Sequence, residues 1–279
     1  MVTHWFDYPN IDPIAIHIGS FGIHWYGISY LFGFICVFLW MNRAAGRRRL
    51  GLSSDQIQDF LVYALIGVLL GGRTGFVIAD VITKHNFADE YLAHPLNFIA
   101  IWQGGMAFHG ALVGVILASL LFLRRHPGLT FGILGDEVVP LISLGIFTTR
   151  LVNFINDELP GKLCLPDQPY CIKFPNYPDG YRYSSQIFEA VLDILTLPII
   201  LFVYSRRPPD GVVFWTWFTI YGITRSIAEI WREPGFTVLG LDGGQFVAVV
   251  QLLIGVVMIV VSYRGGKYTA ARTPAPASA

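Results

Sequence analysis

The chain has 279 residues, and its 19 Lys and Arg balance 19 Asp and Glu, so the formal net charge at pH 7 is zero. Hydrophobic residues make up 54% of the chain and charged residues only 14%, whereas a soluble domain usually has about 25% charged residues. This composition excludes an ordinary soluble enzyme and indicates an integral membrane protein.

Long apolar stretches recur along the chain, and each approaches the ~20 residues that a helix needs to cross the hydrocarbon core of a bilayer. We expect an all-α fold of seven transmembrane helices, at about 17–41, 56–82, 105–123, 131–151, 186–205, 211–231 and 243–263. Residues 1–264 would then form a single membrane domain, and the Ala- and Pro-rich tail at 265–279 is expected to be disordered.

Basic residues are concentrated at alternate helix ends, which predicts the orientation. Eleven of them follow the first, third, fifth or seventh helix: Arg43, Arg47, Arg48, Arg49, Arg124, Arg125, Arg206, Arg207, Arg264, Lys267 and Arg272. By the positive-inside rule these ends face the cytoplasm, so the N-terminus lies outside and the C-terminus inside.

The outward connection at about 152–185 is long enough to form a small cap. It contains Cys164 and Cys171, which would face an oxidising compartment and can form a disulfide there. Two free thiols are the alternative. Cys36 lies within the first helix and is expected to contribute only packing.

Three arginines, Arg73, Arg150 and Arg225, lie inside or at the end of an apolar helix. An arginine at the centre of a transmembrane helix costs about 2.5–3.5 kcal/mol on insertion scales. Near a helix end, as for Arg150, the side chain can snorkel to the interface. Three such residues are hard to explain without an anionic ligand.

Glycines mark two segments of the chain. Gly71, Gly72 and Gly75 surround Arg73, and small residues at this spacing let membrane helices pack closely. That packing explains the glycines but not the arginine. A second glycine-rich segment places His109 about one turn inside the third helix, either as a hydrogen-bonded core residue or as a proton acceptor at neutral pH.

Two helices carry polar faces. Arg150 and Asn153 share a face of the fourth helix, which can be a capped helix end or a site for a phosphate or glycerol headgroup. Tyr221, Arg225 and Glu229 are spaced by four along the sixth helix and share one face. Arg225 and Glu229 can also form an ion pair within that helix, which would meet part of the cost of burial.

Motifs for metal or covalent chemistry are missing from the sequence. The seven histidines are scattered, with no two at metal-ligand spacing on one helix. Neither a P-loop nor a G-x-S-x-G nucleophile turn is present. We therefore expect no metal and no other cofactor, and the sequence identifies no enzyme nucleophile.

Together these segments resemble the prolipoprotein diacylglyceryl transferases of bacterial inner membranes, a family with the same seven-helix, N-out arrangement. The matching stretches follow the family's order along nearly the whole chain: His24-Trp25-Tyr26-Gly27, Gly71-Gly72-Arg73, Gly104-Gly105-Met106, Phe108-His109-Gly110, Arg150 with Asn153-Phe154-Ile155-Asn156, Ser185-Gln186 with Glu189, and Arg225 with Glu229. No single motif is decisive, but their ordered combination is specific.

The resemblance implies a reaction and its partners. The diacylglyceryl group of phosphatidylglycerol would be transferred to the lipobox cysteine thiol of a preprolipoprotein, the first step of bacterial lipoprotein maturation. The protein would lie in the inner membrane among membrane lipids, with its active site toward the periplasm. The signal peptide of the preprolipoprotein would be its protein partner, no nucleic acid would take part, and we expect a monomer.

The resemblance also implies site residues. Arg150 and Arg225 would clamp the phosphate through bidentate guanidinium contacts, and either His109 or Tyr221 would assist deprotonation of the thiol. The remaining substrate-binding positions that the resemblance implies are Tyr26, Asn153, Glu158, Gly161 and Glu229. We also expect Arg73 to contribute to substrate binding by supporting this site from behind.

Two alternatives remain open. This chain departs from the family pattern beside Arg150 and at 183–188, which would suit a catalytically weakened paralogue that binds anionic lipid or lipoprotein. An anion transporter would use the arginines as an ion path, but internal repeats, which are common in that class, are not found in the sequence.

Overall fold

The computed structural model describes residues 7–19, 21–84, 91–100, 105–233, 237–238 and 240–272. In this part of the chain the structure is mostly helical, and it divides into two compact units. The first unit comprises Met1–Met41 and Gly132–Ala270, and the second comprises Asn42–Phe131 and Ala271–Ala279. The expected single membrane domain over 1–264 stays a prediction.

Five helices of the described residues are long and apolar enough to cross a membrane. They are α1 (Trp25–Asn42), α3 (Ser54–Lys84), α5 (Phe131–Ile155), α6 (Ser185–Ser205) and α8 (Gly243–Gly265). On α8, Leu253 and Val257 are 58% and 59% exposed, and contiguous apolar surface of this kind is rare on soluble monomers. The protein is therefore an all-α, multi-pass membrane protein.

The other two expected helices are also present, although they do not meet the same criterion for a membrane span. These are α4 (Phe108–Arg125) and α7 (Val212–Ala228). The helix expected at 105–123 therefore begins and ends slightly later, and the one expected at 211–231 ends earlier.

The beginning of the first apolar stretch is not helical, which corrects the helix expected at 17–41. Strands β1 (Ile14–Ile18) and β2 (Phe21–His24) form an antiparallel hairpin, and α1 starts only at Trp25. Gly19 lies between the strands with φ +60°, a left-handed conformation that glycine adopts without strain and that interrupts a helix. Alternating isoleucines before it favour a strand.

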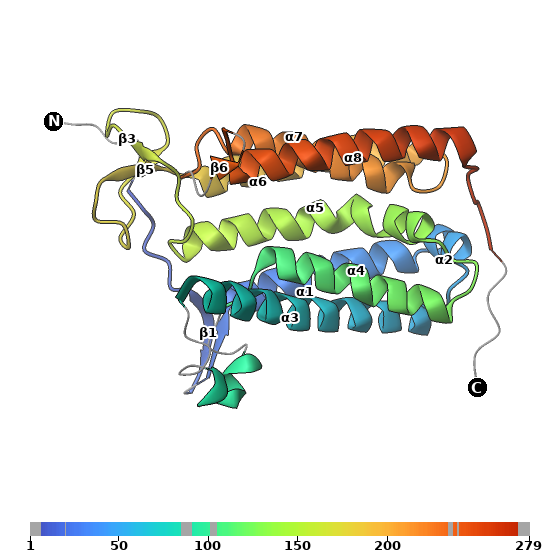
Figure 1. The fold of residues 1–279 in the computed structure, drawn as a ribbon, viewed down its shortest axis with the longest axis horizontal. Helices are drawn as coiled ribbons and strands as arrows, with labels where there is room; N and C mark the ends of the chain where they lie inside the picture. Colours follow the sequence, from blue (N-terminus) through green and yellow to red (C-terminus); the bar gives the residue numbers. More distant parts are fainter. Residues whose placement is uncertain are drawn as a thin grey trace. The chain divides into compact units, whose positions relative to one another are not determined.

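Helices α5, α6 and α7 of the first unit share a small apolar core, formed by Val139, Ile200 and Val213. These helices and α8 lie as long rods with roughly parallel axes (Figure 1). Gly211 immediately precedes α7 and has no side chain to cap the helix. Asp136 of α5 replaces that cap by accepting hydrogen bonds from the backbone N–H groups of Gly211 and Phe214 at 2.8 and 2.9 Å.

The connection after α5 folds into a small sheet at one end of these helices (Figure 1). The antiparallel strand order is β3 (Leu163–Cys164), β5 (Tyr181–Tyr183) and β4 (Cys171–Ile172). A disulfide joins Cys164 to Cys171, with their Cα atoms 6.1 Å apart. We call residues 156–184 the cap.

Two features attach the cap to the helices. Phe154, at the end of α5, packs with Ile172 and Phe174 in a buried cluster. An isolated β-bridge pairs Gly161 with Arg232, just beyond α7. A further hairpin, β6 (Thr237–Val238) and β7 (Leu241–Asp242), precedes α8.

The second unit contains a short helix α2 (Ala44–Leu50), the long helices α3 and α4, and a 3-10 turn, η2 (Pro95–Phe98). Glycines let α3 and α4 pack backbone against backbone. A Cβ added at Gly67 would lie 2.6 Å from the carbonyl oxygen of Gly114, and one at Gly75 would lie 2.8 Å from Cα of Gly110. These helices therefore pack closely through small residues, as the glycine spacing predicts.

The C-terminal tail makes specific contacts as far as the structure describes it. In the first unit, Thr269 donates its hydroxyl to Asp210 at 2.5 Å. In the second unit, Arg272 donates to the carbonyl oxygen of Leu50 at 3.1 Å. The expected disorder of 265–279 stays a prediction for 273–279, which lie outside the described residues.

Candidate functional site

Three arginines of the first unit converge on one carboxylate, that of Glu189 on α6. Nη2 of Arg150 and Nη1 of Arg225 each lie 3.0 Å from the same oxygen, Oε2. Nη1 of Arg232 lies 2.6 Å from the other oxygen, Oε1. Glu189 is buried, with 4% of its surface exposed, so these ion pairs are sheltered from solvent.

Two further carboxylates lie at the edges of this group. Oδ2 of Asp193, one turn after Glu189, is 3.5 Å from Nε of Arg150. Glu229 pairs with Arg225 and lies 3.9 Å from Nε of Arg232. We call these six residues the arginine–carboxylate cluster: Arg150, Glu189, Asp193, Arg225, Glu229 and Arg232.

The cluster corrects one step of the sequence argument. Arg150 and Arg225 were expected to need an external anion to balance their charge, but three internal carboxylates face the three guanidinium groups. The cavity among them, lined in part by Tyr221, has a volume of about 10 Å³, which is room for at most one water molecule. A phosphate therefore enters only if a side chain moves.

Tyr221 belongs to the wall of this cavity. Its hydroxyl accepts a hydrogen bond from Nη2 of Arg150 at 3.4 Å, and its ring stacks on Trp217 with 5.5 Å between the centroids. The hydroxyl thus lies beside the same guanidinium that Glu189 holds.

A second polar group lies about one turn further along α5. Asn153, three residues after Arg150, donates from Nδ2 to the hydroxyl oxygen of Tyr26 at 2.5 Å and to Oε2 of Glu158 at 3.4 Å. The Tyr26 hydroxyl in turn donates to Glu158. Gln186 of α6 donates to the backbone carbonyl of Glu158 at 2.7 Å. We call Tyr26, Asn153 and Glu158 the tyrosine–amide group.

Gly161 lets the cap approach Arg232 closely. Its N–H donates to the carbonyl oxygen of Tyr183 at 2.7 Å, and a Cβ at this position would overlap the carbonyl oxygen of Trp231 and lie 3.0 Å from Cβ of Tyr183. Gly161 is therefore a positioning residue for the segment that carries Arg232.

Ionisable groups of the cap are shifted in opposite directions. Burial raises the pKa of Asp157, although the backbone N–H of Asn176 donates to it at 2.5 Å and lowers the pKa in part. At the exposed edge, hydrogen bonding to Arg182 lowers the pKa of Asp179.

A protein-family model described as prolipoprotein diacylglyceryl transferase matches residues 13–261. The chain belongs to this family. The match includes all of α1 to α7 and most of α8, so it covers both the arginine–carboxylate cluster and the tyrosine–amide group.

Several curated members of the prolipoprotein diacylglyceryl transferase family are similar over nearly their whole length. Each is named phosphatidylglycerol–prolipoprotein diacylglyceryl transferase. The Geobacter sulfurreducens protein is 40% identical over 262 residues, covering 92% of this chain and 97% of the relative. The Methylobacillus flagellatus protein is 40% identical over 267 residues, 92% and 98%. The Nitrosospira multiformis protein is 38% identical over 279 residues, 98% and 91%.

The structure brings together seven of the residues that the sequence singles out. Arg150, Tyr221, Arg225 and Glu229 meet in and around the arginine–carboxylate cluster, and Tyr26, Asn153 and Glu158 form the tyrosine–amide group beside it. The backbone of His109 lies in the first turn of α4, in the second unit. Its side chain lies outside the described residues.

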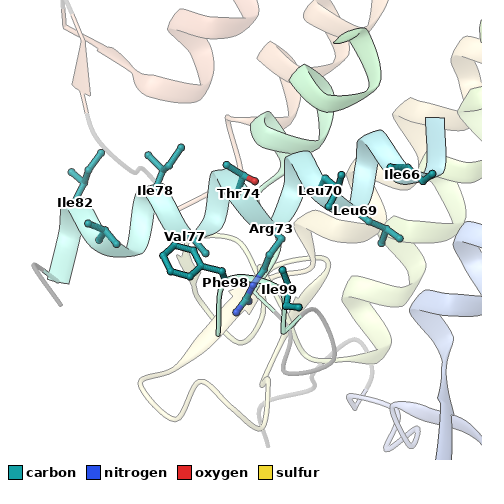
Figure 2. Close-up of a pocket in the computed structure, with 11 residues that line it drawn as sticks. Ile66, Leu69, Leu70, Arg73, Thr74, Val77, Ile78, Ile82, Phe98 and Ile99 are labelled. Atoms are coloured by element: carbon teal, nitrogen blue, oxygen red, sulfur yellow. The ribbon is translucent and has the colours of Figure 1, made fainter. Parts of the chain in front are cut away.

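Arg73 also belongs to the second unit, where it lies in an apolar groove. Its guanidinium donates to the carbonyl oxygens of Asn97 and Gly105, the latter at 3.3 Å, and lies over the ring of Phe76. The groove has a volume of about 590 Å³ and is lined by α3 and by Phe98 and Ile99. Arg73 is the charged residue of a lining that is otherwise almost entirely apolar (Figure 2).

Glu189, Asp193 and Arg232 were not predicted as site residues, although Glu189 lies in a stretch that matches the family and Arg232 follows Glu229 on the same face. A signal for the first two was present, because Glu189 and Asp193 are carboxylates four residues apart inside an otherwise apolar helix. Ionisable residues inside a membrane helix usually have a functional role.

Proposed function

We propose that this protein is a phosphatidylglycerol–prolipoprotein diacylglyceryl transferase, which carries out the first step of bacterial lipoprotein maturation. It transfers the diacylglyceryl group of phosphatidylglycerol to the lipobox cysteine thiol of a preprolipoprotein. Membership of the family and identities of about 40% to relatives of that name support the proposal.

One observation carries the assignment of the phosphate site. Arg150 and Arg225, from different helices, direct guanidinium N–H groups at a single oxygen atom of Glu189. Two guanidinium groups that converge on one buried oxyanion are well arranged to bind a phosphodiester. We therefore assign phosphate binding to Arg150 and Arg225, with Glu229 orienting Arg225.

The reaction that we propose is a substitution at carbon. The cysteine sulfur forms a bond to the carbon of the diacylglyceryl unit that carries the phosphate ester. The bond between that carbon and the ester oxygen breaks, and glycerol phosphate leaves. Guanidinium groups stabilise the negative charge that develops on the leaving phosphate. The thiol proton passes to a base, for which His109 and Tyr221 remain the two candidates.

Other residues would position the substrates. The tyrosine–amide group of Tyr26, Asn153 and Glu158 offers a hydroxyl, an amide and a carboxylate beside the phosphate site, which suits the hydroxyl groups of a glycerol headgroup. Gly161 lets the cap pack closely against the segment that carries Arg232. In the second unit, the groove beside Arg73 is long and apolar, which suits an acyl chain.

We further propose that all seven long helices cross the inner membrane, with the N-terminus and the cap in the periplasm. The eleven basic residues at alternate helix ends support this orientation. Single free cysteines, introduced into a Cys36→Ser background in which Cys164 and Cys171 stay paired, test it. A cysteine at Asp167, on the cap, should react with an impermeant maleimide in intact spheroplasts, and one at Arg207, after α6, only once the membrane is opened.

The activity is tested with purified protein in phosphatidylglycerol liposomes and a synthetic lipobox peptide. Mass spectrometry should detect a thioether-linked diacylglyceryl peptide and an equal amount of released glycerol phosphate. A peptide with serine in place of the cysteine and liposomes of phosphatidylcholine alone are the matched controls.

The same experiment separates the alternatives. Binding of phosphatidylglycerol without any thioether product would identify a lipid-binding paralogue. Anion flux through proteoliposomes that is lost in Arg225→Ala, again without product, would identify a transporter that uses the arginines as its ion path.

A further inference from the structure

Glu189 occupies the position where the proposed function needs a phosphate. Its Oε2 accepts from Arg150 and Arg225 at 3.0 Å each, and its Oε1 accepts from Arg232 at 2.6 Å. Of the three carboxylates in the cluster, it is the one that contacts all three arginines. Asp193 contacts Arg150 alone.

The space and the charge of the cluster both make a second anion incompatible with Glu189 in this position. The cavity beside Glu189 has a volume of only about 10 Å³, which cannot hold a phosphate group. With three guanidinium groups and three carboxylates the cluster is already neutral in formal charge. A phosphodiester also carries one negative charge, so it can replace Oε2 of Glu189 as the anionic partner that Arg150 and Arg225 share.

We propose that the Glu189 carboxylate is an internal substitute for the substrate phosphate. It holds the guanidinium groups of Arg150 and Arg225 in position until the phosphate of phosphatidylglycerol displaces it. This inference rests on the proposed function and names the residue that controls access to its phosphate site. Oε2 leaves Arg150 and Arg225 on displacement, while Oε1 keeps its contact with Arg232.

Arg232 is suited to keep hold of the displaced carboxylate. It follows α7 rather than lying within it, and its backbone is tied to the cap by the bridge to Gly161. A glutamate side chain has three rotatable bonds, so rotation can move one oxygen away while the other stays near Arg232. Glu189 is then a positioning residue, because it acts on the two arginines that would bind the phosphate.

If Glu189 competes with the phosphate for Arg150 and Arg225, removing its charge should strengthen anion binding. Glu189→Gln keeps the size of the side chain but removes the competing negative charge, so an anion should bind more tightly. In neutral phosphatidylcholine nanodiscs, we expect this variant to bind glycerol phosphate at least about tenfold more tightly than the wild-type protein. The KM for phosphatidylglycerol should fall, and kcat should fall with it because the released glycerol phosphate leaves more slowly.

Asp193→Asn is the matched control, since it also removes one negative charge from the same helix and the same cluster. Because Asp193 contacts only Arg150, its variant should tighten glycerol phosphate binding less than about threefold. Equal tightening in both variants would mean that only net charge matters and would overturn displacement. Unchanged or weaker binding in Glu189→Gln would make Glu189 a fixed structural residue and would overturn it too.

A second variant covers the case in which Glu189→Gln does not fold. Glu189→Asp keeps the charge, but its shorter side chain cannot span three guanidinium groups, so it should also bind glycerol phosphate more tightly. Failure of the displacement proposal can be distinguished from failure of the proposed function. Loss of thioether product in the wild-type protein contradicts the function, whereas normal transfer with unchanged binding in the variants contradicts only the role of Glu189.

Discussion

Arg150 of α5 and Arg225 of α7 each place a guanidinium nitrogen 3.0 Å from the same oxygen of Glu189. Each arginine also reaches a second carboxylate with another nitrogen, Asp193 for Arg150 and Glu229 for Arg225. A guanidinium can bridge two anions in this way because its donors form a rigid fork, whereas a lysine presents a single ammonium group.

Arg150→Lys and Arg225→Lys should therefore each lose most transferase activity. A charge-assisted hydrogen bond to a buried anion is worth about 1.5–3 kcal/mol, so kcat/KM should fall roughly 10- to 150-fold. Arg206→Lys, at the exposed end of α6, is the matched control and should transfer normally. Near-normal turnover in either cluster variant would remove the assignment of these arginines to the phosphate.

Tyr26→Phe should impair the enzyme by breaking the tyrosine–amide group. It leaves Asn153 and Glu158 without the hydroxyl that joins them, and an unmet buried polar group costs about 1–3 kcal/mol. A double-mutant cycle with Asn153→Ala measures the coupling, which should exceed about 0.5 kcal/mol for residues in one network. Strict additivity of the two effects on kcat/KM would contradict a shared role.

Gly161→Ala should disturb the site from the cap. Its new Cβ would overlap the carbonyl oxygen of Trp231, so the bridge to Arg232 must open. We expect at least a tenfold loss of transferase activity with helix content unchanged by circular dichroism. Gly265→Ala, at the end of α8 where a Cβ meets nothing within 4 Å, should behave like the wild-type protein.

Asp157→Asn should stabilise the protein at neutral pH. Burial raises the pKa of Asp157, so the folded protein binds this proton more tightly than the unfolded chain, and the stabilisation is lost as pH rises through the raised pKa. Asparagine stays neutral, can still accept from Asn176, and tolerates the φ of +56° at this position. The Tm should rise at pH 7 and match the wild-type value near pH 4.

Asp179→Asn gives the opposite sign in the same cap. The hydrogen bond to Arg182 lowers the pKa of Asp179, so its stabilisation is present above the usual value of about 3.9 and is lost as pH falls below it. This variant should lower the Tm at pH 7 and have no effect at low pH. A fall in Tm for both variants at pH 7 would contradict the argument.

The sequence predicts the helices well because hydropathy over about 20 residues is a strong, local signal. It misses the hairpin before α1 because the isoleucines of β1 extend the apolar run of the helix that follows. The pair of Arg225 with Glu229 is predictable from their spacing on one helix. The pairs of Glu189 with Arg150 and Arg232 are not, since they join different segments and depend on how α5, α6 and α7 pack.

The arrangement of charges on α6 and α7 also bears on biogenesis. Glu189 and Asp193 on α6 are acidic and Arg225 on α7 is basic, so either helix alone would bring unbalanced charge into lipid. The two helices are separated in the chain only by the short connection at residues 206–211. We expect the translocon to release them together as a helical hairpin, with opposite charges already paired before the bundle assembles.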